Sequence, residues 1–194
     1  MPVAAIILAA GASRRLGQPK QLLHVNGETL VARSARIAQE AGAAPIIIVL
    51  GAQEEAVRAA LHCTGAIAIE NPSWSSGLST SVRAGVEALQ VHAPQADGVL
   101  LMNCDQPRLD SLHLAAVIAA FETKGSEAII ASSYAGVLGV PALFPHRYFD
   151  ELKSLTGDIG ARVLFKRHAD ALIAIPFEGG DIDIDTPEDL AYLN

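Results

Sequence analysis

Short runs of consecutive apolar residues recur along the chain, separated by longer stretches in which apolar and polar residues mix. A continuous apolar run is typical of a strand that is buried on both faces of a sheet. Strands are therefore predicted over residues 3–8, 46–50, 66–69, 98–102, 128–131 and 171–175.

Helices are expected between these strands, because the intervening stretches have helical composition and end at turn residues such as Gly42. They are predicted over residues 30–41, 54–61, 82–89, 112–121, 148–155 and 161–167. Strands that alternate with helices at this spacing form a parallel sheet with helices on both faces. The sequence thus predicts an α/β fold with one doubly wound, Rossmann-like and mostly parallel sheet.

The pattern is less regular after residue 132. Gly136, Gly139 and Pro141 interrupt a short β region there. Near the end of the chain, Thr186 and Pro187 precede two acidic residues. This order predicts the start of a helix, because Thr caps a helix, Pro suits its first position and acids complement its dipole.

The composition predicts one folded domain over residues 1–194, because 51% of the residues are hydrophobic and 18% are charged. The net charge of −7 argues against general nucleic-acid binding, which needs a basic face. Cys63 and Cys104 make no disulfide framework. The first residues lack the features of a signal peptide, and no apolar run approaches the roughly 20 residues of a membrane span. We therefore expect a soluble cytoplasmic protein with no membrane partner.

The loop after the first strand, AAGASRRLGQPK, gathers cations in an acidic chain. Ligands of open α/β sheets bind beyond the carboxyl ends of the strands, where this loop lies. Ala9, Ala10 and Gly11 allow a ligand to reach backbone N–H groups, and Arg15 and Lys20 add positive charge. The loop is therefore expected to bind a polyphosphate. Its spacing fits neither the Gly-x-Gly-x-x-Gly fingerprint nor a P-loop, which ends in Gly-Lys-Ser/Thr.

This loop and five later motifs resemble the MobA/MocA-like nucleotidyltransferases, which make the dinucleotide forms of the molybdenum cofactor. The later motifs are NPSWSSGLSTSVRAG, LLMNCDQP, GVPALF, LTGDIGAR and DIDTPEDL. The resemblance covers nearly the whole chain. It implies a fold of the nucleotide-diphospho-sugar transferase type, with a nucleotide-binding part at about residues 1–110 and an acceptor-binding part at about residues 132–185.

The segment Leu8-Ala9-Ala10-Gly11 is more similar to the cytidylyltransferase branch than to the guanylyltransferase branch, which typically has Leu-Ala-Gly-Gly. The resemblance therefore favours CTP as the nucleoside triphosphate, a molybdopterin-type acceptor and a client molybdenum hydroxylase. The alternatives are a GTP-using guanylyltransferase, a sugar-phosphate nucleotidyltransferase and a non-catalytic carrier of the molybdenum cofactor. Sugar-phosphate enzymes commonly have a longer acceptor region, and a passive carrier needs no paired metal carboxylates.

An aspartate at the carboxyl end of a central strand, such as Asp105, lies on the ligand side of the sheet. The resemblance makes Asp105 the main Mg²⁺ ligand and Asp185, which precedes Thr-Pro, the second. Asp183 is the alternative, because alternate residues of an extended segment point the same way. Mg²⁺ is usually held by one or two carboxylates plus substrate phosphates.

The resemblance also assigns the other site residues. The nucleotide-binding residues are Leu8, Ala9, Ala10, Gly11, Arg15, Lys20, Asn71, Gly77 and Ser79. The acceptor-binding residues are Gly139, Pro141, Gly157, Asp158 and Gly160. Trp74 is expected to pack rather than to stack on a base.

The predicted reaction is the attack of an acceptor phosphate on the α-phosphorus of an Mg²⁺-bound nucleoside triphosphate, with release of pyrophosphate. A phosphate monoester has a second pKa of about 6, so it needs no strong general base at neutral pH. Arg15, Lys20 and Asp105 are the predicted catalytic residues. The two cations offset phosphate charge, and Asp105 holds the metal together with Asp185.

Overall fold

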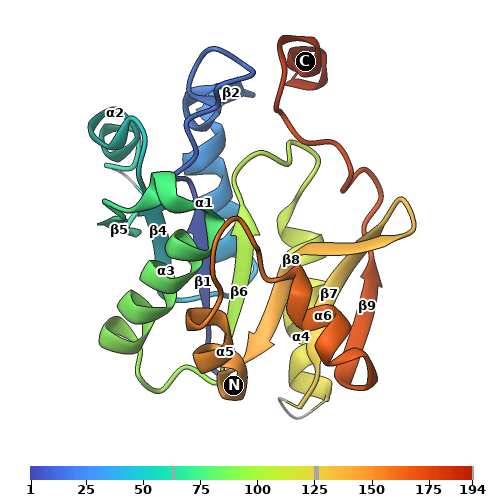
Figure 1. Cartoon of the computed structure of the whole chain (residues 1–194). Coiled ribbons are helices and arrows are strands. Elements are labelled where there is room, and N and C mark those ends of the chain that lie inside the picture. Colours follow the sequence, from blue (N-terminus) through green and yellow to red (C-terminus); the bar gives the residue numbers. More distant parts are fainter. Residues whose placement is uncertain (63, 125–126, 194) are drawn as a thin grey trace.

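Seven strands form one sheet in the computed structural model, which describes residues 1–62, 64–124 and 127–193 (Figure 1). The strand order is β5-β4-β1-β6-β8-β7-β9. All six predicted strands are confirmed, with small changes in their ends. They are β1 (Val3–Leu8), β4 (Ile46–Leu50), β5 (Ile67–Glu70), β6 (Gly98–Asn103), β7 (Ile129–Tyr134) and β9 (Leu172–Pro176).

The seventh strand, β8 (Val137–Pro145), runs antiparallel between β6 and β7. Only a short β region was predicted here. Ala135 and Gly136 join β7 to β8 with φ angles of 47° and 76°, as a two-residue hairpin turn requires. The register of β8 against β7 shifts opposite Pro141, because a proline has no N–H group to donate to the ladder.

Helices cover both faces of the sheet. They are α1 (Leu30–Glu40), α2 (Glu54–Ala59), α3 (Leu78–His92), α4 (Ser111–Thr123), α5 (Phe149–Lys153) and α6 (Arg162–Arg167). The six predicted helices are confirmed, although α3 begins four residues earlier and α5 is shorter than expected. Further short elements were not predicted from the sequence. They are the small hairpin β2 (His24–Val25) and β3 (Glu28–Thr29) and the 3₁₀ helices η1 (Lys20–Leu22), η2 (Trp74–Ser76), η3 (His146–Tyr148) and η4 (Ala169–Ala171).

The core has two layers, one on each face of the sheet, and β1 divides its side chains between them. Ala5 and Ile7 pack in the layer under α1 and α4. Ala4 and Ile6 pack in the layer under α3, α5 and α6. This division explains the continuous apolar run, because a strand with two buried faces has no polar side.

The segment after β9 returns to the carboxyl end of β6, across the upper edge of the sheet in Figure 1. The backbone N–H of Ile184 donates to the carbonyl of Asp105 at 2.9 Å. The predicted terminal helix is the 3₁₀ helix η5 (Pro187–Leu193), and Asp189 caps its start by accepting from the N–H groups of Asp185 and Thr186. The ends of β1 and β6 and this C-terminal segment therefore meet at one edge of the sheet.

Within the described ranges, no helix combines the length and the apolarity needed to cross a membrane. Cys104 is buried just after β6, and burial followed by the charge of Asp105 raises the pKa of its thiol to about 12. Cys63 lies outside the described residues.

Candidate functional site

The loop after β1 is held by Gln21, a residue that was not singled out from the sequence. Gln21 is buried, and its Nε2 donates to the carbonyl oxygens of Ala9 at 2.8 Å and Gly11 at 2.7 Å. The N–H groups of Gly11 and Ala12 have no acceptor among the residues that the structure describes. The loop thus uses its carbonyls internally and keeps N–H donors for a ligand, as a phosphate-binding loop requires.

Four predicted site residues from distant parts of the chain form one network of ion pairs. The Nζ of Lys20 lies 2.6 Å from Oδ2 of Asp105 and 2.7 Å from Oδ1 of Asp185. An η nitrogen of Arg15 lies 2.6 Å from Oδ2 of Asp185. The side chains of Lys20 and Asp105 are 15% and 10% exposed, whereas that of Arg15 is 72% exposed. The network therefore runs from the protein interior to its surface.

These charges control one another's ionisation. Burial lowers the pKa of Lys20, but the charge of Asp105 and hydrogen bonds to both carboxylates outweigh it, so the pKa lies above its usual value. Burial raises the pKa of Asp185, but Lys20 and Arg15 together bring it below its usual value. Both groups are therefore charged at neutral pH.

Asp183, the alternative metal ligand, differs from Asp185. Protein atoms that displace water from its carboxyl group, together with the negative charge of Asp105, raise the pKa of Asp183 to about 6. The residue as a whole is nevertheless exposed, and within the described ranges it has no cationic partner at ion-pair distance. Lys20 thus binds Asp185 and leaves Asp183 outside the network.

The chemistry of the donors fits a hard divalent cation that is shared with substrate phosphates. Oδ1 of Asp105 is buried and has no hydrogen-bond partner among the described residues, so one carboxylate oxygen is available. Within the same part of the chain, no group of three His, Cys, Asp or Glu side chains is placed to hold a metal ion. Two carboxylates plus phosphate oxygens form the ligand set that Mg²⁺ commonly uses.

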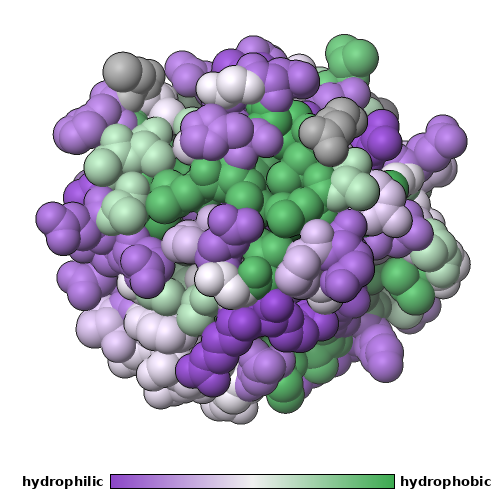
Figure 2. Space-filling view, turned by 90° about the horizontal axis from the view of Figure 1, so that it is seen from above, coloured by the Kyte–Doolittle hydropathy of each residue, from purple (hydrophilic) through white to green (hydrophobic). Residues whose placement is uncertain are grey.

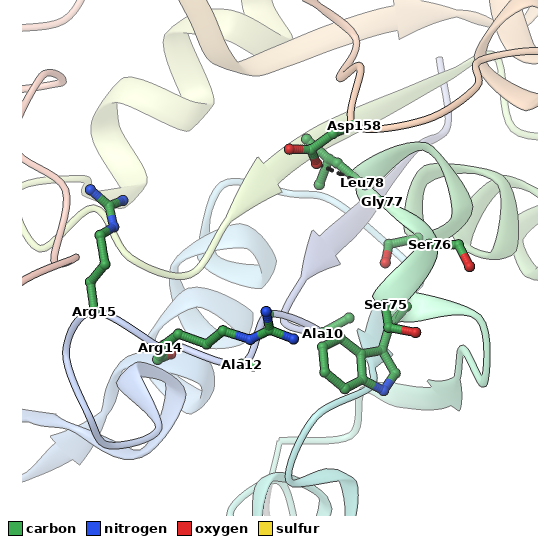
Figure 3. A pocket seen from close by; sticks show the side chains of 13 residues that line it. Ala10, Ala12, Arg14, Arg15, Ser75, Ser76, Gly77, Leu78 and Asp158 are labelled. Carbon is green, nitrogen blue, oxygen red and sulfur yellow. Dashed lines mark hydrogen bonds between the residues drawn. The ribbon is translucent and has the colours of Figure 1, made fainter.

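A cavity of about 680 Å³ opens beside this network (Figure 3). Its walls come from the loop after β1, from the segment that spans η2 and the start of α3, and from Asp158. A smaller cavity of about 180 Å³ shares Ala10, Gly11 and Leu78 with it and reaches Lys20 and Asp105. The predicted phosphate-binding loop therefore connects a large open cavity to the carboxylates.

Figure 2 views the molecule from above, onto the edge of the sheet where the strands end. Hydrophobic residues gather in the middle of this face, and hydrophilic residues surround them. An apolar centre with a polar surround suits a ligand that combines a flat apolar ring with charged groups.

The structure brings two predicted nucleotide-binding residues against the predicted acceptor-binding loop. Ser79 Oγ donates to the carbonyl of Gly157 at 2.7 Å, and Ser79 is 1% exposed. Gly77 has a φ of 116°, and a Cβ at this position would collide with the same carbonyl. Asp158 accepts from the N–H of Leu78 at 3.2 Å (Figure 3). The two loops form one continuous wall rather than two separate sites.

Asn71 is buried, and its side chain is used inside the protein. Its Nδ2 donates to Thr80 at 2.9 Å and Ser81 at 3.0 Å, and its Oδ1 accepts from the N–H of Ser73 at 3.0 Å. The structure therefore shows Asn71 fixing the loop that follows β5, and its direct contact with a nucleotide stays a prediction.

The other predicted acceptor residues lie in two places. Gly160 packs against Leu78, beside the cavity wall. Gly139 and Pro141 belong to β8, where the hydroxyl of Tyr134 packs closely against Gly139 and Pro141 is buried. The structure thus brings Gly160 beside Leu78 at the cavity wall, and it uses Gly139 and Pro141 to pack β8.

Gln106 is a further buried polar residue to which the sequence assigned no role, although it directly follows Asp105. Its Nε2 donates to the carbonyls of Gly180 at 2.8 Å and Val140 at 3.3 Å. It therefore connects the end of β6 to β8 and to the C-terminal segment. The sequence could have indicated Gln106, because its polar side chain directly follows the predicted metal ligand Asp105.

Known proteins resemble this chain over nearly all of its length. The sequence model of the MobA-like NTP transferase domain matches residues 5–172. The chain is 33% identical over 198 residues to the purine catabolism protein PucB of Bacillus subtilis, covering 95% of this chain and 92% of that protein. It is 30% identical over 207 residues to nicotine blue oxidoreductase of Paenarthrobacter nicotinovorans, covering 98% of this chain and 96% of that protein.

A protein named probable molybdenum cofactor guanylyltransferase, from Synechococcus elongatus, is 36% identical over 112 residues, covering 56% of this chain and 53% of that protein. Among solved structures, Rv0371c from Mycobacterium tuberculosis has a TM-score of 0.80 and 31% identity, covering 100% of this chain and 98% of that chain. A complex of Rv0371c with manganese has a TM-score of 0.75 and 28% identity at the same coverage.

Proposed function

Because the chain belongs to the MobA-like NTP transferase family and is a nucleotidyltransferase, we propose that it transfers the cytidylyl group of CTP to a molybdopterin-type acceptor. In this reaction, an oxygen of the acceptor phosphate forms a bond to the α-phosphorus of CTP. The bond between the α-phosphorus and the bridging oxygen to the β-phosphorus breaks, and pyrophosphate leaves with that oxygen.

The observation that carries this proposal is the meeting of Arg15, Lys20, Asp105 and Asp185 in one network of ion pairs. Arg15 lines the large cavity, and Lys20 and Asp105 line the smaller one beside it. A protein that only carries a cofactor has no need for two carboxylates paired with two cations beside a phosphate-binding loop. Transfer to phosphorus is mainly a matter of alignment and charge neutralisation, and this cluster offers both. In our proposal, Arg15 and Lys20 stabilise the charge that builds up on the departing pyrophosphate.

Asp105 and Asp185 are the proposed ligands of Mg²⁺. When bound, the cation would neutralise charge on the nucleotide phosphates. The unpartnered Oδ1 of Asp105 and the similarity to a protein solved with manganese support this assignment. The N-terminal part, about residues 1–110, is proposed to bind the nucleotide, and about residues 132–185 to bind the acceptor, within one domain.

CTP is proposed over GTP because the loop reads Leu-Ala-Ala-Gly instead of Leu-Ala-Gly-Gly. The acceptor follows from the same resemblance and from the relative named as a molybdenum cofactor enzyme. The product would then pass to a client molybdenum hydroxylase. A guanylyltransferase, a sugar-phosphate nucleotidyltransferase and a cofactor carrier are the competing functions.

Pyrophosphate release separates these functions. The protein is incubated with Mg²⁺, the molybdenum cofactor and CTP, GTP, ATP or UTP in turn, with Asp105→Asn as the inactive control. Release with CTP alone supports the proposal, and release with GTP alone would move the protein to the guanylyltransferases. Release of pyrophosphate with a sugar phosphate in place of the cofactor would favour a sugar-phosphate nucleotidyltransferase. Cofactor binding without pyrophosphate release for any nucleotide would favour the carrier.

A further inference from the structure

The side chains of Arg14 and Trp74 line the large cavity and have no part in the network of ion pairs. Among the residues that the structure describes, the guanidinium of Arg14 and the indole N–H of Trp74 have no hydrogen-bond or ion-pair partner. Arg15 and Lys20, which follow Arg14 in the same loop, are both paired. A cation and an aromatic ring that face one cavity therefore keep their recognition groups for a ligand.

Trp74 is held in a fixed position. A Cβ on Gly51 would lie 2.7 Å from the Cβ and Cγ of Trp74 and 2.8 Å from the Cβ of Ala10. The tryptophan thus fits over a glycine at the end of β4 and beside the phosphate-binding loop. The backbone N–H of Trp74 donates to the backbone carbonyl of Asn71 at 3.2 Å, so the buried Asn71 also anchors the main chain at this position.

The side chains of Arg14 and Arg15 point in different directions (Figure 3). In Figure 3, Arg14 and Arg15 leave the loop in different directions, and Arg14 extends toward Ala10. Arg15 instead pairs with Asp185. The two neighbouring arginines therefore face different parts of the site, and of the two only Arg15 belongs to the ion-pair network.

We propose that Trp74 and Arg14 recognise the nucleobase, with the indole stacked on the face of the base and the guanidinium donating to its edge. This inference rests on the proposed function, since it concerns the nucleotide of the same site. It replaces the expectation from the sequence that Trp74 only packs, because Trp74 lines the cavity. A cavity of about 680 Å³ can hold a nucleotide, and stacking on an aromatic ring is available to every base. Stacking alone therefore gives affinity without selectivity.

Selectivity comes from Arg14. A guanidinium donates two parallel hydrogen bonds and accepts none, so it pairs with an edge that offers two adjacent acceptors. Cytosine offers N3 and O2, and guanine offers O6 and N7, whereas donors and acceptors alternate along the edges of adenine and uracil. Arg14 therefore selects CTP and GTP over ATP and UTP by about tenfold or more, as one bidentate pair allows.

The test uses the fact that Trp74 is the only tryptophan of the chain, so its fluorescence reports on this site alone. The full-length protein with Mg²⁺ is titrated with the four nucleoside triphosphates and with inorganic tripolyphosphate, which has no base. CTP and GTP should quench the fluorescence at the lowest concentrations. Tripolyphosphate should bind in calorimetry with little quenching.

Two variants separate base recognition from charge. Arg14→Lys keeps the positive charge but loses the bidentate geometry, so it should remove the preference for CTP and GTP while tripolyphosphate binding stays within about twofold. Trp74→Leu has no tryptophan fluorescence, so its binding is measured by calorimetry. It should weaken the binding of every nucleotide by about tenfold and leave the binding of tripolyphosphate unchanged. Thermal unfolding confirms that each variant is folded.

An unchanged base preference in Arg14→Lys, or equal quenching by tripolyphosphate and CTP, would overturn the inference. Because these are binding measurements, they are independent of turnover. A wild-type protein that selects bases but releases no pyrophosphate would overturn the proposed reaction and keep this inference. Normal turnover with no base preference would overturn this inference and keep the proposed reaction.

Discussion

The Nζ of Lys20 lies 2.6 Å from Oδ2 of Asp105, although 85 positions separate the two residues. Both side chains are largely buried, and Asp185 is the second partner of the lysine. An amine between two carboxylates offsets their mutual repulsion. This contact therefore belongs to the stability of the fold as well as to the proposed chemistry.

We expect Lys20→Met to destabilise the protein by about 3 kcal/mol, because it leaves the largely buried carboxylate of Asp105 without its cation, while Asp185 keeps Arg15. Asp105→Asn should destabilise the protein less than Lys20→Met does. The double variant should be more stable than the sum of the single effects predicts, by about 1–3 kcal/mol of coupling. Urea unfolding in the presence of EDTA measures all three, and additive effects would show that the pair is not coupled.

Arg15 makes a contrasting prediction, because its side chain is 72% exposed. An exposed ion pair contributes at most about 1 kcal/mol, so Arg15→Ala should leave the free energy of unfolding nearly unchanged. Its pyrophosphate release should fall by about two orders of magnitude or more, since the cation is proposed to stabilise the leaving group. Arg36→Ala, which removes the exposed ion pairs of Arg36 on α1 with Glu28 and Glu40, is the matched control and should keep full activity. Near-normal turnover of Arg15→Ala would contradict the proposed role.

Asp183 predicts a pH dependence of stability. Its pKa is about 6 in the folded protein, above the usual value of 3.8, so the folded state favours the protonated form. This group therefore stabilises the fold below pH 4, and that contribution is lost as the pH rises to 6. Asp183→Asn should thus match the wild type at pH 4 and be more stable at pH 8, in EDTA. A stability difference that is the same at both pH values would show that the pKa is not raised.

Gly77 controls the contact between the two loops. Its φ of 116° is a conformation that other residues rarely adopt, and a Cβ would collide with the carbonyl of Gly157. Gly77→Ala should therefore cost about 1–3 kcal/mol of stability and weaken nucleotide binding by moving the loop. Gly11→Ala is the control for stability, because a Cβ added there would have nothing within 4 Å and its φ is not positive. Equal unfolding midpoints for both variants would contradict this account.

The parallel part of the sheet could be predicted because each of its strands contains a continuous apolar run. In β1, β4 and β6 nearly every residue of that run is buried, whereas the edge strands β5 and β9 are only partly covered. Residues 46–50 are an example of a buried run, since all five are buried. The strand β8 could not be predicted in the same way. Gly139 and Pro141 interrupt its pattern, and its place between β6 and β7 depends on pairing between residues far apart in the sequence. The first turn of α3 was likewise hidden, because its serines resemble a turn.

The site divides in a similar way. The positions of Arg15, Lys20 and Asp105 follow from strand ends that meet at one edge, which the sequence indicates. Asp185 lies beyond the last strand, and only the family resemblance assigned it to the site. The packing of Ser79 on Gly157 does not, since it depends on the shapes of two loops that have no periodic pattern. The role of Gln21 was also missed, because its two acceptors are backbone carbonyls of a loop whose shape has no pattern in the sequence.

The choice between Asp183 and Asp185 leads to the last prediction. Lys20 and Arg15 hold Asp185 on the side of Asp105, and neither is paired with Asp183. Asp105→Asn and Asp185→Asn should each weaken binding of Mn²⁺ in the presence of CTP by about tenfold or more, because each removes the charge of a proposed oxygen ligand. Asp183→Asn changes the local charge equally but should weaken Mn²⁺ binding by less than about threefold, since it removes a nearby charge and no proposed ligand. Electron paramagnetic resonance of free Mn²⁺ measures the three affinities directly. A loss at Asp183 that exceeds the loss at Asp185 would reverse the assignment, and the ion pairs of Asp185 would then serve only to hold Lys20 against Asp105.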